Sequence, residues 1–427
     1  MPSRFQAPRG TRDLLPADMA TFRRLEDDAR RMAALYGYRP IETPMFEDSG
    51  VFERGVGEVT DIVEKELFRI RTPGSDEERW ALRPEPTAGI CRAYVEHGMH
   101  TLPQPVKVTM FGPMFRYDRP QAGRYRQFWQ WDVEAIGEAG PAIDAEIIEL
   151  AYRFLNEVGV ANVEMHLNSI GDQHCRPRYI EALVEHMSAS AHELPELERH
   201  RLAKNPLRVL DSKNARTLGL LGDAPRMADF LCDACRVHWE GLLVHLETLG
   251  VPVTPAPLLV RGLDYYTRTA FEFYQTGEQG QQSALGGGGR YDGLIELFGA
   301  KPTPGIGFGL GIDRIAALAG RPDDAPLAHA VAIVVGADPG ATTARLRLAT
   351  ELRAAGVPSS ADLAQRTLSR QLERAAREGA HFAVVVGDEL DSGQVQLRDL
   401  EAGTQRLVNV ADLTREIQRA HGSHRHG

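Results

Sequence analysis

One stretch of the sequence, FRYDRPQAGRYRQFWQWDVE from Phe115 to Glu134, limits the fold more than any other. Its two ends have the composition of β-strands, and a basic turn containing proline and glycine separates them between Asp118 and Gly123. Side chains two residues apart in a strand share a face. One face of the predicted second strand of this hairpin therefore carries side chains whose charge changes from positive to negative. We call it the graded face, and it consists of Arg124, Arg126, Phe128, Gln130, Asp132 and Glu134.

The other face of the same arm is predicted to pack in the core, because it carries Tyr125, Gln127, Trp129, Trp131 and Val133. The graded face has arginines at one end, carboxylates at the other, and an aromatic ring between them. Such a series suits a ligand with a phosphate group, a planar base and a cationic or N–H-rich end. This stretch alone leaves open the alternative of an antiparallel hairpin with one solvated face.

The composition limits the class of protein. A chain of 427 residues is too long for one ordinary core, so we expect two or three domains. No apolar run has transmembrane length and the N-terminus lacks a signal-peptide core, which predicts a cytoplasmic protein without membrane contact. A net charge of −10 argues against a generally basic nucleic-acid-binding protein.

The pattern along the chain divides it into segments of different character. An amphipathic helix is predicted over residues 17–36, a helical insertion over residues 172–256, and a strand over residues 258–262. The composition predicts a linker at residues 323–328. Alternating strands and helices beyond it predict a separate α/β domain over residues 329–427.

Several further motifs occur in order along the chain. They are RGTRDLLP at residues 9–16, IETPMFE at 41–47, LRPEPTAG at 82–89, RGLDYYTRTAFEF at 261–273, GGGGRYDGL at 286–294 and GIGFGLGIDR at 305–314. Singly, a glycine run or an FR dipeptide is weak evidence. Together with the hairpin, at these spacings, they resemble the bacterial-type histidyl-tRNA synthetases, a class II aminoacyl-tRNA synthetase family, over essentially the whole chain.

The resemblance implies a fold and a reaction. The expected fold is an α+β catalytic domain, an antiparallel sheet flanked by helices over residues 1–322, with the helical insertion at 172–256 and a C-terminal α/β domain like an anticodon-binding domain. The implied reaction activates L-histidine with ATP and Mg²⁺ to histidyl-adenylate, and then transfers the histidyl group to the 3′ end of tRNA(His). The first class II motif implies a homodimer with Pro44 near its interface.

The resemblance also implies residues for ATP, for catalysis and for tRNA. Arg116 is expected at the α-phosphate, and Phe128 and Arg314 on the two faces of adenine, with Arg124 also at the nucleotide. Arg116 and Arg261 are the expected catalytic cations, and Arg119 and Gln121 the contacts to the tRNA acceptor end. Glycines at 305, 307, 309 and 311 are predicted to leave the strand backbone open to the nucleotide.

Histidine is the second substrate, and its groups call for particular partners. Its ammonium needs carboxylate and hydroxyl acceptors, and its imidazole needs partners at both ring nitrogens. The implied set is Glu85, Thr87, Arg116, Gln130, Glu134, Arg261, Tyr265 and Tyr266. One departure is Pro86, where the family commonly has glycine; proline removes a backbone N–H and fixes φ, although Glu85 and Thr87 on either side are kept.

Cys232 and Cys235 form a CxxC pair with His238 nearby. A structural zinc site usually needs four ligands, and Cys91 and Cys175 are remote in the sequence, so we expect no metal site here and cysteines packed as small hydrophobic residues.

Two rival functions have to be weighed against histidine activation. One is a catalytically inactive paralogue that senses histidine as a regulatory subunit of ATP phosphoribosyltransferase. Such paralogues typically lack the C-terminal domain and lose motif residues, whereas this chain has the domain and keeps Arg116, Glu134, Arg261 and Arg314. The other rival is a class II synthetase for a different amino acid, which RGLDYY at residues 261–266 disfavours.

Overall fold

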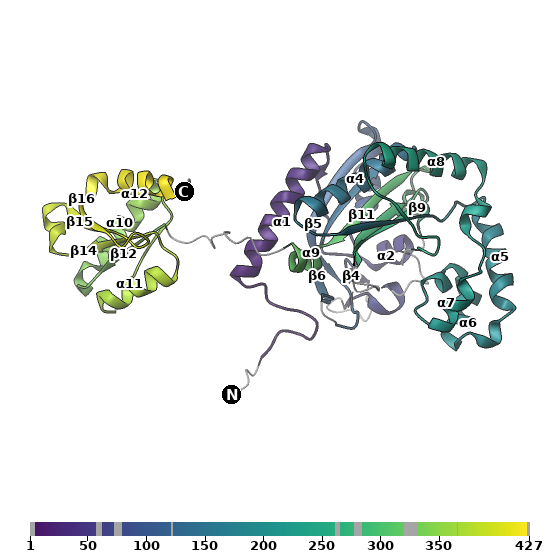
Figure 1. The fold of residues 1–427 in the computed structure, drawn as a ribbon, viewed down its shortest axis with the longest axis horizontal. Helices are drawn as coiled ribbons and strands as arrows, with labels where there is room; N and C mark the ends of the chain where they lie inside the picture. Colours follow the sequence, from purple (N-terminus) through teal and green to yellow (C-terminus); the bar gives the residue numbers. More distant parts are fainter. Residues whose placement is uncertain are drawn as a thin grey trace. The chain divides into compact units, whose positions relative to one another are not determined.

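The computed structural model describes residues 5–56, 62–71, 79–120, 123–260, 265–276, 284–319, 331–364 and 366–424. The chain forms two compact units, Met1–Arg321 and Pro322–Gly427 (Figure 1). Arg261, Gln121 and the predicted linker at residues 323–328 lie outside the described residues.

The first unit is built on an eight-stranded sheet of order β1-β5-β6-β11-β10-β9-β7-β8. The strands are β1 (Arg39–Pro40), β5 (Val106–Phe115), β6 (Gln127–Ile136), β11 (Gly305–Gly311), β10 (Ala284–Arg290), β9 (Thr267–Gln275), β7 (Val163–Ser169) and β8 (Thr254–Pro255). All pairs are antiparallel except β1 with β5 and β7 with β8 at the two edges. This arrangement confirms the predicted antiparallel sheet.

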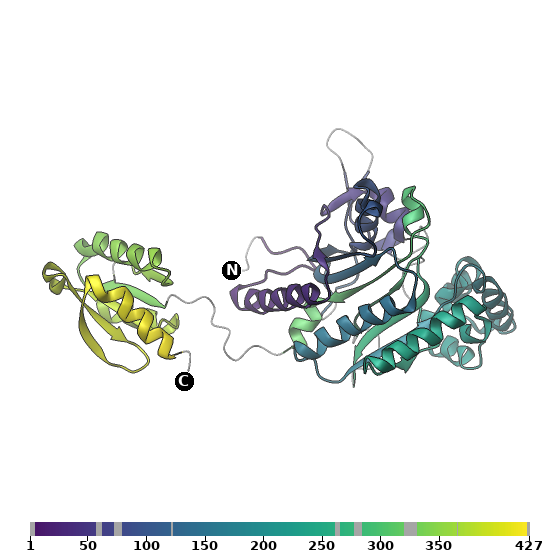
Figure 2. The ribbon, with the colours of Figure 1, turned by 90° about the horizontal axis from the view of Figure 1, so that it is seen from above.

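One face of this sheet carries the main core. The helices α1 (Pro16–Leu35), α4 (Pro141–Glu157) and α8 (Asp233–Thr248) run along it (Figure 2). Trp131 and Val133 of β6 point into this core, and the Trp131 ring centroid lies 4.4 Å from that of Phe154. The predicted packing face of the hairpin is therefore confirmed at its inner half.

The opposite face receives α3 (Thr87–Glu96), which packs through Ile90 and Tyr94 on Val108 of β5. Because side chains alternate along a strand, Gln130, Asp132 and Glu134 of β6 share this second face with α3. The helix α2 (Ser49–Val56) and a small sheet of β2 (Phe46–Asp48), β4 (Trp80–Leu82) and β3 (Arg69–Ile70) lie beyond α3. The sheet topology thus brings the segment around residue 85 to the polar face of β6.

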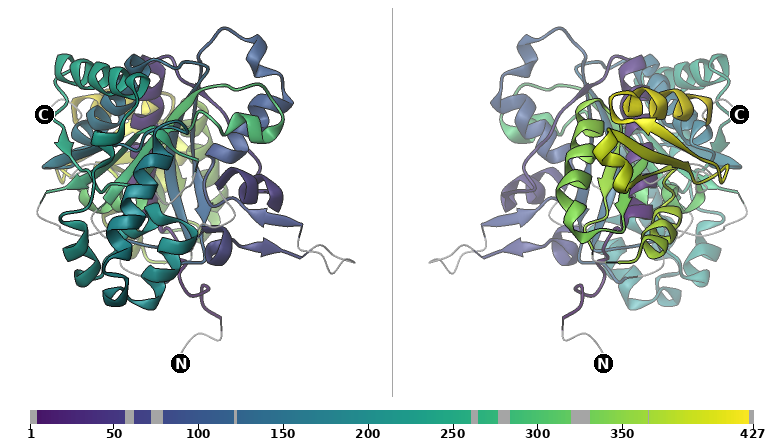
Figure 3. Two further views of the ribbon diagram at one scale, coloured as in Figure 1. Left: turned by 90° about the vertical axis from the view of Figure 1, so that its right-hand side faces the viewer. Right: turned by 90° about the vertical axis from the view of Figure 1, so that its left-hand side faces the viewer.

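The helical insertion has a small core of its own. It consists of α5 (Arg176–Ser188), α6 (Glu196–Lys204), α7 (Ala215–Leu221) and the first turn of α8, packed around Tyr179, Leu183 and Met187. The later part of α8 contributes Leu242 and Leu246 to the main core. In Figure 3 the insertion (teal) and the small three-stranded sheet stand on different sides of the unit.

The second unit is an α/β domain, as predicted. Its sheet has the order β13-β12-β14-β15-β16, with β12, β13 and β14 parallel. The strands are β12 (Ala332–Gly336), β13 (Ser359–Ala361), β14 (Phe382–Val386), β15 (Gln394–Asp399) and β16 (Gln405–Asn409), and the helices are α10 (Thr342–Ala354), α11 (Leu368–Arg377) and α12 (Val410–His424).

Two local predictions were wrong. In the segment predicted as a strand at 258–262, the described residues 258–260 form a turn and coil, and the strand is β8, at Thr254–Pro255. The strand β6 begins only at Gln127, so Arg124 and Arg126 precede it. No helix among the described residues is both long enough and apolar enough to span a bilayer.

Candidate active site

An open cavity of about 570 Å³ lies on the polar face of the large sheet. Its walls come from the hairpin, from β10 and β11, from the start of the helix α9 (Ile312–Leu318), and from the insertion at Arg208 and Asp211. Of the residues predicted to contact the nucleotide or histidine, it is lined by Arg116, Arg124, Phe128, Gln130 and Arg314.

The arginines predicted at the nucleotide are held by polar contacts with backbone carbonyls or with a carboxylate. The guanidinium of Arg116 lies 5.3 Å from the centroid of the Phe128 ring, and its Nε donates to the carbonyl of Pro84 at 2.8 Å. Arg314 donates to the carbonyl of Ala284 on β10. Arg124 pairs with Asp118 at 3.2 Å. Arg116, Arg124, Arg314 and the Phe128 ring thus line one cavity, which offers the cations and the flat surface that a nucleoside triphosphate requires.

Asp313 fixes the position of Arg314, and no role was predicted for it. One carboxylate oxygen of Asp313 accepts from the backbone N–H of Trp129 at 2.7 Å, and the other accepts from Arg12 at 2.8 Å. These bonds tie the first turn of α9 to β6 and to the N-terminal segment. The sequence signal for this role of Asp313 was the Asp-Arg pair at the end of GIGFGLGIDR. Only the arginine of that pair was assigned a function.

Deeper in the same face lies a group of three buried carboxylates, which we call the inner carboxylate group: Glu85, Asp132 and Glu134. Their residues are 4%, 3% and 1% exposed. Glu85 accepts from the backbone N–H groups of Thr87 at 2.9 Å and Ala88 at 3.0 Å, so it initiates α3. The hydroxyl of Thr87 donates to Glu134 at 2.6 Å. Three acids so close together carry more negative charge than an ordinary core tolerates.

Tyr291 belongs to this group of contacts, and sequence reasoning gave it no role. Its hydroxyl donates to the second oxygen of Glu134 at 2.5 Å. Its ring centroid lies 5.9 Å from that of Tyr265, which in turn lies 4.7 Å from Tyr266. The predicted tyrosines and Tyr291 therefore form a continuous wall beside Glu134. The motif GGGGRYDGL contained the signal, because a tyrosine follows its glycine run.

Burial raises the pKa values of all three side chains in the inner carboxylate group. Burial raises the pKa of Asp132 well above its ordinary value, and the charges of Glu134 and Glu85 add to the increase. Burial also raises the pKa of Glu134, to about 8, against the hydrogen bonds from Thr87 and Tyr291. Burial raises the pKa of Glu85, whereas its backbone hydrogen bonds and the charge of Arg116 lower it. A bound cation would reverse these shifts.

Two polar atoms here have no hydrogen-bond partner among the described residues: Oδ2 of Asp132 and Oε1 of Gln130. A buried acceptor without a donor costs roughly 1–3 kcal/mol. Both residues lie on the same face of β6, and Gln130 also lines the open cavity. The site therefore lacks donors that a ligand with N–H groups would supply.

The glycines of β11 have a purpose in addition to the one predicted. A Cβ at Gly307 would lie 1.7 Å from Oε2 of Glu134, and one at Gly309 would lie 2.5 Å from Oδ1 of Asp132. A Cβ at Gly305 would meet the ring of Tyr291 at 2.2 Å. The glycines make room for the inner carboxylates and for Tyr291, while Gly309 and Gly311 also line the open cavity.

The hairpin turn forms a separate basic hollow, lined by Arg9, Tyr117, Asp118, Arg119, Pro120 and Arg126. Arg119 is exposed. Arg126 stacks on Tyr117, with 3.7 Å between its guanidinium carbon and the ring centroid. Arg126 therefore leaves the graded face on which the strand pattern had placed it, because β6 starts one residue later.

Comparison with known proteins follows the same division of the chain. Residues 10–315 match the family model described as histidyl-tRNA synthetase, and residues 329–420 match an anticodon binding domain. A histidine–tRNA ligase from Desulforudis audaxviator is 46% identical over 96% of this chain and 98% of its own length. One from Dehalococcoides mccartyi is 44% identical over 97% and 99%. The crystal structure of apo S. aureus histidyl-tRNA synthetase has a TM-score of 0.80 at 33% identity, over 97% of this chain and 99% of that one.

Proposed function

Because the chain belongs to the histidyl-tRNA synthetase family, we propose that the inner carboxylate group binds L-histidine and that the open cavity beside it binds ATP. The enzyme activates histidine with ATP and transfers the histidyl group to tRNA(His). The observation that carries the site assignment is the group of three buried acids on the same sheet face as a cavity that Arg116, Arg314 and Phe128 line.

Histidine fits the inner site through its charges. Its ammonium would offset the negative charge of Glu85 and Asp132 and would donate to the unpaired oxygens of Asp132 and Gln130. Its imidazole would lie against the wall of tyrosines, with Glu134 accepting one ring N–H and Tyr266 supplying the second partner. Thr87 remains close enough to hold Glu134 in place.

The chemical step is an in-line displacement. An oxygen of the histidine carboxylate attacks the α-phosphorus of ATP, the bond to the bridging oxygen of the β-phosphate breaks, and pyrophosphate leaves. Arg116 would meet the α-phosphate, and Phe128 and Arg314 would enclose adenine. Arg261 is assigned to the same phosphate by its place in RGLDYY. The protein's part is to position the reactants and to stabilise negative charge.

Magnesium is expected to arrive on the phosphates, because Mg²⁺ usually keeps several waters and binds through one or two carboxylates plus phosphate. Bound there, it neutralises phosphate charge. Glu66 and Glu272 are among the carboxylates that line the cavity and could complete its shell.

In the second step the 3′-terminal ribose hydroxyl of tRNA attacks the activated carbonyl, loses its proton, and displaces AMP. The basic hollow with Arg9 and Arg119 is placed beside the open cavity through the shared residue Asp118, which suits an acceptor end. We assign Arg119 and Gln121 to that contact. In the second unit, α11 and the turn before it present Arg366, Arg370 and Arg377 to solvent, which suits a phosphate backbone.

The functional domains are proposed as residues 1–322 for catalysis, interrupted by the insertion at 172–256, a linker at 323–328, and 329–427 for the anticodon end. We also propose a homodimer. Pro44 is exposed, and next to it Met45, Phe46 and Trp80 are 49%, 49% and 39% exposed, an apolar patch that a second copy would cover. Light scattering should give twice the 47.1 kDa of one chain.

The test of function is ATP–pyrophosphate exchange measured with each of the twenty amino acids. Exchange with histidine alone is expected. Exchange with another amino acid would contradict the specificity assigned to the inner site. Histidine binding without any exchange would favour the regulatory paralogue instead.

A further inference from the structure

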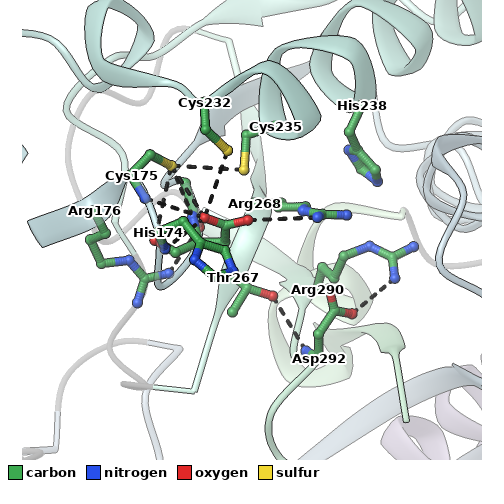
Figure 4. Close-up of polar contacts among 12 residues, drawn as sticks. His174, Cys175, Arg176, Cys232, Cys235, His238, Thr267, Arg268, Arg290 and Asp292 are labelled. Atoms are coloured by element: carbon green, nitrogen blue, oxygen red, sulfur yellow. Dashed lines mark hydrogen bonds and ion pairs between the residues drawn. The ribbon is translucent and has the colours of Figure 1, made fainter. Parts of the chain in front are cut away.

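Three of the four cysteines of the chain meet at one point, although two of them are far from the third in the sequence. The sulfur atoms of Cys175, Cys232 and Cys235 point toward one another (Figure 4), and a carboxylate oxygen of Asp172 joins them. The four ligand atoms all lie within 4.8 Å of one another. Cys175, although remote from the CxxC pair in the sequence, therefore lies beside it in the structure.

The distances match the edges of a tetrahedron around one metal ion. With Zn–S bonds of about 2.3 Å, two sulfur ligands stand about 3.8 Å apart, and a sulfur and a carboxylate oxygen about 3.5 Å apart. Sγ of Cys175 lies 3.8 Å from Sγ of Cys235 and 3.4 Å from Oδ1 of Asp172. Sγ of Cys232 lies 3.9 Å from the same oxygen.

The local backbone is organised for anionic ligands. Asp172 and Cys175 are separated by two residues, as are Cys232 and Cys235, which is the spacing common in structural zinc sites. Cys175 immediately precedes α5 and Cys232 immediately precedes α8, so two helix N-termini face the cluster. The backbone N–H of Asp172 donates to Sγ of Cys175 at 3.3 Å. Helix N-termini and backbone N–H donors suit side chains that bind a metal as anions.

The surrounding charges also favour a ligated carboxylate. Oδ1 of Asp172 accepts from the backbone N–H of His174 at 2.9 Å, and Arg268 lies 3.6 Å from Oδ2. Cysteines packed only as small hydrophobic residues would not require a carboxylate oxygen among their sulfur atoms. His238 lies farther along α8, 3.5 Å from Asp144, and does not belong to the cluster.

We propose that Asp172, Cys175, Cys232 and Cys235 bind one structural Zn²⁺ ion. All four coordination positions are filled by the protein, so the ion fastens parts of the fold and takes no substrate. It joins the start of α5 to the start of α8. Arg176, next in sequence to Cys175, donates to the carbonyls of Gly171 at 3.0 Å and Tyr266 at 2.7 Å. The ion therefore links the helical insertion to the segment that carries Tyr266.

The experiment begins with the full-length wild-type protein, purified under reducing conditions without chelator. Elemental analysis should find about one Zn²⁺ per chain. After the ion is exchanged for Co²⁺, the spectrum should show a thiolate-to-cobalt charge-transfer band and the strong visible bands of a tetrahedral site. This measurement needs no variant, so it stands even if a variant fails to fold.

Variants assign the ligands. Cys175→Ser and Cys235→Ser should lose most of the zinc, and Asp172→Asn should weaken Zn²⁺ binding at least tenfold by competition with a chelator. The control is Cys91→Ala, which removes the buried cysteine outside the cluster and should retain the full metal content. Removing the ion from the wild-type protein should lower its melting temperature.

Three results would overturn the site. The first is wild-type protein that holds no zinc and takes up neither Zn²⁺ nor Co²⁺ when reduced. The second is an equal loss of metal in Cys91→Ala. The third is a metal-free protein whose mass shows Cys175 and Cys235 joined in a disulfide, which would make the cluster an oxidisable dithiol.

Discussion

Two of the buried groups of charged side chains in the first unit differ in whether the protein itself supplies the opposite charge. Arg290 of β10 and Asp144 of α4 are both fully buried and form an ion pair, and Arg290 also contacts Asp292 and the carbonyls of Glu138 and Gly140. This group is complete, because every charge has a partner of opposite sign. It joins the sheet to α4.

The inner carboxylate group contains three acids and no cation of its own. Among the described residues, Arg83 and Arg116 are the cations that lower the pKa of Asp132. Arg83 donates to the carbonyls of Thr43 and Pro113 and to Glu42 through Nε and Nη1, while its buried Nη2 has no hydrogen-bond partner among the described residues. Arg116 donates to the carbonyl of Pro84. A buried group of charges that serves stability is thus neutralised within the protein, whereas one that serves binding is left for a ligand to neutralise.

The largest expected effect is on the complete group. Asp144→Ala leaves the guanidinium of Arg290 buried without its main partner, which should lower the free energy of unfolding by about 3–5 kcal/mol. Denaturation followed by tryptophan fluorescence measures this directly, because all four tryptophans, Trp80, Trp129, Trp131 and Trp239, lie in the first unit.

A double variant separates the charge from the packing. Asp144→Leu combined with Arg290→Met removes both charges and should be less destabilised than Asp144→Ala. Asp28→Ala, on the outer side of α1, is the control and should cost under about 1 kcal/mol. A loss in Asp144→Ala as small as in the control would show that the pair is not needed.

The second largest effect is expected on the rate of adenylate formation. Arg261→His removes the proposed cation at the α-phosphate and should slow single-turnover adenylate formation by about 10²–10³, with far smaller changes in histidine and ATP affinity. Arg30→His, on the exposed side of α1, is the matched control. Normal adenylate formation together with a much earlier melting transition would make Arg261 a structural residue like Arg290.

A smaller effect is expected from Glu134→Gln, which keeps the shape of the side chain and removes its charge. Losing a charge-assisted bond to the imidazole should reduce histidine-dependent exchange by roughly tenfold to a hundredfold, or about 1.5–3 kcal/mol. Stability near neutral pH should not fall, because burial raises the pKa of Glu134 to about 8, so the free folded protein holds this side chain mostly protonated and glutamine replaces one neutral group with another. Glu157→Gln at the exposed end of α4 is the control, and exchange within twofold of wild type would refute the role of Glu134.

The smallest expected effect is on the number of protons that the protein releases when it binds histidine. The pKa of Glu134 is about 8 in the folded protein and near 4.5 when unperturbed, so between these values the folded state holds a proton that the unfolded chain has released. The stability of the free protein should therefore decrease as pH rises through this range. A bound histidine cation lowers the carboxylate pKa, so binding near neutral pH should release up to about one proton.

Calorimetry in two buffers of different ionisation enthalpy would count these protons. Glu134→Gln should release fewer than wild type. Equal proton release in the two proteins would place the titrating group at Asp132 or Glu85 instead.

Local patterns in the sequence predicted much of the fold. The apolar spacing of residues 17–36 corresponds to α1 at Pro16–Leu35, and the alternation in the hairpin placed Trp131 and Val133 in the core. The α/β pattern after residue 329 gave β12, α10, α11 and β14 in order. These features depend on contacts between neighbours in the chain, so periodicity was enough to predict them.

The family resemblance predicted which residues would gather at the site, and the motifs around Arg116, Phe128 and Arg314 do line one cavity. It did not predict how the site is supported. Gly307 and Gly309 could not be matched to Glu134 and Asp132 without the register of β11 on β6. Tyr291 and Asp313 were visible in motifs, but their partners lie 157 and 184 residues away along the chain.

Patterns in the sequence were sufficient to predict the order of elements, the polar face of the hairpin and the division into two units. Only the tertiary structure decided which distant groups meet. Cys175 stands 60 residues before Cys235, and no local period relates them. Their approach follows from the packing of α5 against the start of α8, a long-range contact set by side-chain complementarity in the insertion core. Long-range contacts of this kind leave no periodic trace in the chain, which is why the cysteine cluster became apparent only in three dimensions.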